Sequence, residues 1–229
     1  MLHACFKALE IESLRISPYA LREGVLHDML GRLDNLDPRD KTVDALMSRY
    51  GVDRDQVGRV KQVALKACDK VADGMFLRPA HRQLLGWAVD LHETGLGVSH
   101  SQFHLHSGYL VENSDMAGFT RQEQFFLAAL VRNQRRAITT GFTDQLPTRL
   151  HEPLRMTLFC LRFASVLCRS REDKAIPSFR LSGGENMITA SFPDKWKDSH
   201  PLTLFDLQQE SKDLELIGLH FRVTQPPSA

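Results

Sequence analysis

The chain has 229 residues, of which 25% are charged and 42% belong to the hydrophobic set, and its formal net charge is +1. This composition is ordinary for a globular protein of one large or two small domains. So small a net charge creates no whole-molecule field that attracts polyanions, so any anion site must come from local clusters of basic residues. No specific nucleic-acid partner is therefore expected.

The cysteines and the apolar runs indicate the cellular compartment of the protein. The four cysteines, Cys5, Cys68, Cys160 and Cys168, form no CxxC pair, which is typical of a reduced, cytosolic protein. No apolar run approaches the ~20 residues that a membrane helix needs. The sequence thus predicts a cytoplasmic protein without a transmembrane segment, and leaves peripheral association with a membrane surface open.

Residues 1–34 are expected to hold a strand and a helix that end an earlier domain. The segment "LRI" is typical of the end of a buried strand, and Ser17 with Pro18 marks a helix start. Apolar residues recur at helical spacing as far as Leu33. The stretch "GRLDNLDPRDK" that follows is interpreted as a linker, because it is rich in helix breakers.

Residues 35–175 are predicted to form a helical domain. Asp53, followed by Gln56, and Thr120, followed by Glu123, have the spacing of capping boxes at helix starts. Pro79 opens another helix, and a helix is expected through His106 to Val111. The longest apolar-rich helix is "LRMTLFCLRFASVLCRS".

Residues 176–224 are predicted to form a small α/β domain of the order β-β-α-β, and residues 225–229 a disordered tail. "SFRLSGG" and "MITASF" alternate like the strands of a hairpin, "PLTLFDLQQESKDLEL" has helical periodicity, and "GLHFRVTQ" is expected to be the last strand. The fold class is thus mainly α, followed by a small α/β cap.

Four histidines, His92, His100, His104 and His106, lie within fifteen positions. His100 and His104 share one face if they lie on one helix, a spacing that suits a metal ion. A hydrolytic metal site also needs carboxylates, and only Asp90 and Glu93 are near. The residues alone favour a capped helix-turn-helix over a metal site.

Three longer stretches closely resemble the C-terminal half of bacterial exopolyphosphatases, of the exopolyphosphatase and guanosine pentaphosphate phosphohydrolase family. They are "ISPYALREGVLHDM", "LLGWAVDLHETGLGVSHSQFHLHSGYLVENSDMAGFTRQEQ" and "LAALVRNQRRAI". The resemblance implies that residues 1–34 end an actin-like catalytic half that is otherwise missing here. It also implies that residues 35–175 are similar to HD-type metal phosphohydrolases.

The HD resemblance implies a degraded metal site. Gln56 stands where the first histidine ligand is expected, His92-Glu93 replaces the His-Asp pair, and Ser165 replaces the last aspartate. Glutamine and serine are neutral, poor ligands for such a cation. We therefore expect no metal and no catalytic residue in this chain, and the resemblance implies Mg²⁺ only for the full-length family enzyme.

Three arginines, Arg132, Arg135 and Arg136, follow one another at the end of a predicted helix. They suit a solvated helix C-terminus, and equally a track for inorganic polyphosphate, because guanidinium groups match phosphate oxygens. His100, His104 and His106 would add donors to this track, more so when protonated below ~6.5.

The resemblance therefore favours the polyphosphate-binding, dimer-forming portion of an exopolyphosphatase, which releases terminal phosphate processively. Motifs for phosphate-binding loops, such as GxxxxGK[ST] or GxGxxG, do not occur in the sequence. Three alternatives stay open: a guanosine pentaphosphate phosphohydrolase, a residual HD-type hydrolase, and an interaction domain without a phosphate ligand.

Overall fold

The computed structural model describes residues 37–72, 77–173, 176–184 and 186–224. The predicted strand and helix of residues 1–34 and the predicted tail 225–229 lie outside the described residues. The proposed domain boundaries accordingly stay predictions.

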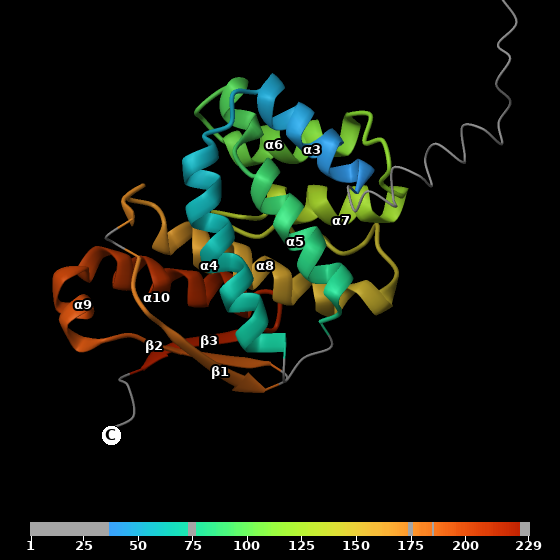
Figure 1. The fold of residues 1–229 in the computed structure, drawn as a ribbon. Coiled ribbons are helices and arrows are strands. Elements are labelled where there is room, and N and C mark those ends of the chain that lie inside the picture. Colours follow the sequence, from blue (N-terminus) through green and yellow to red (C-terminus); the bar gives the residue numbers. More distant parts are fainter. Residues whose placement is uncertain (1–36, 73–76, 174–175, 185, 225–229) are drawn as a thin grey trace, which may run out of the picture. The chain divides into compact units, whose positions relative to one another are not determined.

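Most of the described chain is helical (Figure 1). The helices before the sheet are α3 (Pro38–Arg49), α4 (Arg54–Ala72), α5 (Pro79–Leu91), α6 (Phe103–Asn113), α7 (Arg121–Arg132) and α8 (His151–Leu167). Two 3-10 turns, η1 (Thr94–Gly97) and η2 (Thr148–Leu150), precede α6 and α8.

The predicted helix starts are confirmed where the sequence supplies a cap. The Asp53 carboxylate accepts the backbone N–H groups of Asp55 and Gln56, both at 3.0 Å. At α7, Thr120 and Glu123 form the reciprocal capping box. The linker prediction was wrong at its end, because α3 already begins at Pro38; proline fits the first turn of a helix, where its missing N–H is not needed.

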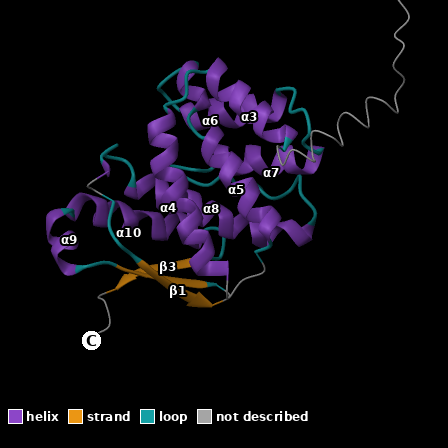
Figure 2. Cartoon of the chain, viewed as in Figure 1, coloured by secondary structure: helices purple, strands orange, loops and turns teal. Residues whose placement is uncertain are grey.

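A three-stranded sheet follows the long helix α8 (Figure 2). Strand β1 (Arg180–Gly184) pairs antiparallel with β2 (Met187–Ser191), and the register of the pair places Gly184 opposite Met187. The chain then passes through α9 (Asp194–Ser199) and α10 (Pro201–Glu215) and returns as β3 (His220–Thr224), parallel to β2. The predicted mainly α fold with a β-β-α-β unit is confirmed, and the short helix α9 was not predicted.

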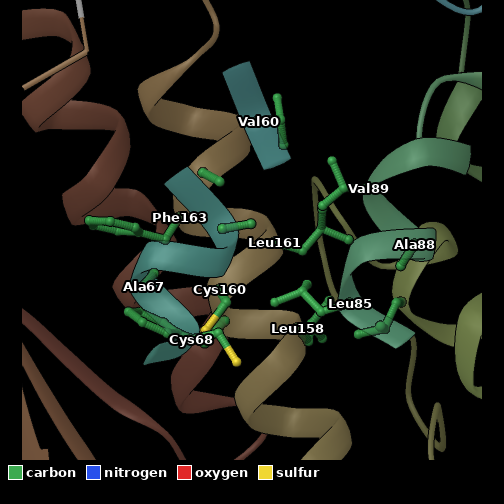
Figure 3. Close-up of a cluster of buried hydrophobic side chains, with 14 of the residues drawn as sticks. Val60, Ala67, Cys68, Leu85, Ala88, Val89, Leu158, Cys160, Leu161 and Phe163 are labelled. Carbon is green, nitrogen blue, oxygen red and sulfur yellow. The ribbon is translucent and has the colours of Figure 1, made fainter. Parts of the chain in front are cut away.

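The core lies between α4, α5 and α8, as Figure 3 shows. Val60, Ala67 and Cys68 of α4 meet apolar side chains of α8 and α5, all of them nearly inaccessible to solvent. Phe163 joins this core to the sheet, since its ring contacts those of Phe179 and Phe221. No helix in the described ranges is long and apolar enough to cross a membrane.

Candidate functional site

The four positions identified as a degraded metal site line one pocket of about 330 Å³. Gln56 comes from α4, His92 and Glu93 follow α5, and Ser165 lies on α8. Folding thus brings together residues that are more than a hundred positions apart in the sequence. Whether these four side chains could bind a metal ion depends on their hydrogen bonds and their charge.

His92 is buried at the end of α5 and is held in one orientation. Its Nδ1–H donates to the Val89 carbonyl oxygen at 2.6 Å, which leaves Nε2 as the acceptor nitrogen. Burial lowers the pKa of His92, and the neighbouring Glu93 opposes that shift. His92 is therefore a neutral imidazole prepared as metal-binding histidines are, with its second nitrogen fixed by a carbonyl.

The loop after His92 packs tightly against α6, which explains the glycine of "HETG". The Ser107 hydroxyl accepts the Gly95 N–H at 2.7 Å and donates to the His92 carbonyl at 3.1 Å. A Cβ at Gly95 would lie 2.0 Å from the Phe103 carbonyl oxygen and 2.5 Å from the Ser107 nitrogen. Only glycine permits this approach, which fixes the position of the His92 backbone.

Glu93 is paired with an arginine that the sequence analysis did not single out. The Arg171 Nη2 donates to Glu93 Oε1 at 2.5 Å, and its Nη1 donates to Asp53 Oδ2 at 2.8 Å. The second oxygen of Glu93, Oε2, is buried and has no hydrogen-bond partner among the described residues. A guanidinium thus neutralises the carboxylate that a metal ion would otherwise bind.

Gln56 and Ser165 are both engaged with protein atoms. Gln56 Nε2 donates to the Cys168 carbonyl at 2.9 Å, and its Oε1 accepts from Arg59 at 3.2 Å. The Ser165 hydroxyl donates to the Leu161 carbonyl one turn earlier, at 2.8 Å. Each side chain serves as a structural hydrogen-bonding group.

The donor set therefore does not fit the divalent cation of an HD-type hydrolase. Within the described ranges no group of three or more His, Cys, Asp or Glu residues is arranged to hold a metal ion. The pocket instead holds three cations, Arg135, Arg169 and Arg171, beside the carboxylates of Glu93 and Glu210. The sequence signal for two of them was the "CRSR" segment directly after α8, where two arginines follow the end of the helix.

The three arginines of the predicted track face different surroundings. Arg132 pairs with Glu112 at 2.7 Å and lines a second, smaller pocket. Arg135 lies over the Phe103 ring, 4.9 Å from its centroid, and lines the first pocket together with the exposed His100. Arg136 is exposed, and its backbone has a positive φ of 61°, a conformation that residues other than glycine rarely adopt.

The other two histidines of the track differ in their access to solvent. His106 is half-buried, whereas His104 is buried and its Nδ1 has no hydrogen-bond partner in the described part of the chain. Burial, reinforced by the positive charges of Arg135 and Arg136, lowers the pKa of His104 to about 4. His104 is therefore neutral at pH values where an ordinary histidine gains its proton, unlike the protonated donor that the sequence suggested.

Comparison with known families assigns the chain to a phosphatase family. Residues 39–211 match the family model described as Ppx/GppA phosphatase, domain III. Because this match covers well over half of the chain, the protein belongs to the Ppx/GppA phosphatase family. The resemblance drawn from "HETG" and its neighbouring segments is confirmed.

Three bacterial relatives that share one name align along almost the whole chain. The guanosine-5'-triphosphate,3'-diphosphate pyrophosphatase of Pseudoalteromonas translucida (strain TAC 125) is 34% identical over 220 residues, which are 95% of this chain and 44% of that protein. The protein of the same name from Aeromonas hydrophila is 32% identical over 227 residues, 98% of this chain and 46% of its own length. The Photobacterium profundum protein of that name is 31% identical over 211 residues, 92% of this chain and 42% of its own length. The chain thus spans less than half the length of these curated relatives.

Proposed function

We propose that this chain is the substrate-holding portion of a hydrolase that acts on guanosine pentaphosphate. The observation that carries the proposal is the alignment of guanosine-5'-triphosphate,3'-diphosphate pyrophosphatases with 92–98% of the chain. This favours the alternative raised from the sequence over its main interpretation, an exopolyphosphatase. In both cases the substrate is a polyanion with phosphoanhydride bonds.

Binding of inorganic polyphosphate is the second candidate, and the arginines after α7 favour it. No ion pair joins Arg135 or Arg136 to a carboxylate among the described residues, although the Glu93 carboxylate acts on Arg135 from a distance, so both guanidinium groups can donate to phosphate oxygens. A polyphosphate carries no base or sugar, so charge and hydrogen bonds alone would hold it, with strong dependence on salt. We propose that Arg132, Arg135, Arg136, His100 and His106 form this track, with neutral His104 as a buried hydrogen-bonding group.

Phosphoryl transfer depends on positioning, metal ions and electrostatic stabilisation of the transferring group. The sequence contains neither GxxxxGK[ST] nor GxGxxG, and within residues 37–72, 77–173, 176–184 and 186–224 no group of three or more His, Cys, Asp or Glu side chains is arranged to hold a metal ion. We therefore propose that this chain contributes binding, and that Mg²⁺ belongs to the full-length enzyme without a ligand in this chain. Holding remote phosphates of a substrate raises turnover at a distant centre because their binding energy fixes the reacting group.

The family resemblance also makes a cytoplasmic homodimer part of the proposal. The cysteines Cys68, Cys160 and Cys168 are free and buried, as suits a reducing compartment. On α10, Leu202 and Phe205 are 80% and 56% exposed, and such apolar side chains are candidates for a subunit contact. Sedimentation equilibrium of the parent chain and of Phe205→Lys tests this contact. A dimeric parent chain with a monomeric variant supports a subunit contact on α10. A monomeric parent chain contradicts it.

The binding test uses guanosine pentaphosphate and long-chain polyphosphate as separate ligands at rising salt concentrations. The paired substitutions Arg132→Gln and Arg136→Gln should weaken binding and lower the salt slope by about one for each lost phosphate contact. Arg180→Gln with Arg222→Gln, two exposed arginines on the sheet, is the matched control. Tight binding of the pentaphosphate supports the first candidate, and tight binding of the polymer alone supports the second. Failure of both ligands to bind contradicts the proposal.

A further inference from the structure

At the positions where the HD resemblance implies a degraded metal site, a side chain of the protein supplies positive charge. Arg171 contacts Glu93 at 2.5 Å and Asp53 at 2.8 Å, on both sides of its guanidinium. Its backbone has a positive φ of 58°, which is unfavourable for a side chain of this kind and is maintained by these contacts. Arg171 thus already balances the charge of Glu93, and the other charged side chains of the pocket determine which ligand it can bind.

One remaining charge is positive and unpaired. Arg135 is half-buried, lies over Phe103 and has no carboxylate partner among the described residues. Arg169, which also lines the pocket, shares its charge with Asp206. Burial lowers the pKa of Arg135 most, the charges of Arg136 and Arg169 lower it further, and the nearby Glu93 carboxylate opposes them with a smaller effect. The wall formed by Arg135 and Arg169 suits an anion.

Glu93 adds a hydrogen-bond acceptor to the positive charge of the two arginines. Its side chain is 8% exposed, and its Oε2 receives no hydrogen bond from the described residues. A buried carboxylate oxygen without a donor is costly, and a ligand that supplies a donor relieves that cost. The ligand that fits the pocket must therefore be an anion that also carries a hydrogen to donate.

We propose that this pocket binds hydrogen phosphate. Arg135 and Arg169 would donate to its oxygens, and its P–OH would donate to Glu93 Oε2 after a rotation of the Glu93 side chain that turns this oxygen, which is closed to solvent in the structure, towards the pocket. The pocket volume of about 330 Å³ lies at the small end of ligand pockets and accommodates such an ion. This site shares Arg135 with the proposed track, whereas Arg132 and Arg136 do not line the pocket. It does not depend on which polyanion the enzyme cleaves, because inorganic phosphate alone is the ligand.

Sulfate provides the sharpest comparison. It has the shape and charge of phosphate but carries no hydrogen at neutral pH, whereas both phosphate species present there keep at least one P–OH. A site built to accept a hydrogen bond rejects the analogue that lacks the donor, because its own acceptor is then left unpaired. We expect phosphate to bind at least about tenfold more tightly than sulfate at matched ionic strength.

The experiment is calorimetric titration of the 229-residue chain with inorganic phosphate and, separately, with sulfate. Arg135→Gln should weaken phosphate binding by at least about tenfold, since it removes a charge-assisted donor. Arg180→Gln, on the exposed edge of β1, should leave binding unchanged. Competition by tripolyphosphate indicates that the end of a chain is the source of the bound phosphate. Phosphate binding without that competition indicates the free ion.

Glu93→Gln tests the acceptor directly. The amide offers an N–H to either anion, so the preference for phosphate over sulfate should fall towards one. Because this variant also loses the Arg171 ion pair, its fold is checked by circular dichroism, while Arg135→Gln leaves that pair intact. Equal binding of phosphate and sulfate to the parent chain, or full phosphate binding by Arg135→Gln, would overturn the proposal. The track is tested separately by Arg132→Gln with Arg136→Gln, because those substitutions lie outside the pocket and leave Arg135, the residue common to both proposals, in place.

Discussion

Arg162 is the largest fully buried side chain of the described residues, and replacing it tests how α10 is held against α8. The side chain is 0% exposed and makes ion pairs with Glu210 at 2.6 Å and Asp213 at 2.8 Å. Its Nη1 also donates to the Asn133 carbonyl at 2.7 Å. One guanidinium thus ties the end of α7, the middle of α8 and the last turns of α10 together.

Arg162→Met keeps much of the length of the side chain and removes its charge and donors. Removing one partner of a buried ion pair costs about 3–5 kcal/mol, because the other charge is left uncompensated. For a protein of about 150–250 residues, each kcal/mol lowers the midpoint of thermal unfolding by about 2–4 °C. The variant should therefore melt about 6–20 °C below the parent chain. Urea denaturation gives the free energy directly.

The loss should also depend on pH through Glu210. Burial raises the pKa of Glu210 above its usual value, and Arg162 opposes that rise. Without Arg162 the pKa rises further, so the folded state binds this proton more tightly than the unfolded state. The stability linked to such a group is present below its unfolded pKa and is lost as pH rises through its folded pKa. The deficit of Arg162→Met should therefore be smaller near pH ~4.3, the ordinary value for glutamate, than near pH ~7.

The control for this experiment removes the negative charges together with the arginine. Arg162→Met combined with Glu210→Gln and Asp213→Asn should recover part of the lost stability, because no buried carboxylate is then left unpaired. A loss below about 1 kcal/mol for the single variant, the size of an exposed pair, would refute the reasoning. So would a deficit that grows as the pH falls.

Three further results are expected. Gly95→Ala should lower the free energy of unfolding by at least about 1–3 kcal/mol, since the added methyl group meets backbone atoms; urea denaturation equal to the parent would contradict this. In an NMR titration the imidazole of His104 should stay neutral down to its pKa of about 4. Because this pKa lies below the value in the unfolded chain, the stability linked to His104 is lost as the pH falls from the unfolded pKa to the folded pKa. A titration midpoint near ~6.5 would be inconsistent with the burial of His104. Gln56→His with Ser165→Asp should bind no Mn²⁺ by calorimetry while Arg171 remains paired, and adding Arg171→Ala should be required for any binding; metal uptake by the double variant would show that the guanidinium is not the obstacle.

The sequence by itself determined much of the secondary structure. Asp53, Pro79 and Thr120 mark helix starts because their side chains or rings act within a few residues of the chain, without tertiary help. The alternation of "SFRLSGG" and "MITASF" likewise predicted the hairpin. The resemblance of "HETG" and its flanking segments identified the family, and position-by-position comparison marked Gln56 and Ser165 as departures from a metal site.

Tertiary structure decided which group pairs with the carboxylate of Glu93. Arg171 lies 78 residues from Glu93, and no local pattern announces a contact between them. The same holds for Arg132 at the end of α7 and for Arg135 and Arg136 after it: Arg132 pairs with Glu112, Arg135 lies over Phe103 beside the first pocket, and Arg136 is exposed. The sequence predicts that these arginines lie close to a helix end, whereas the partner of each charge depends on which distant elements pack beside it. Local propensities act over one turn, but desolvation and ion pairing are set by the whole fold.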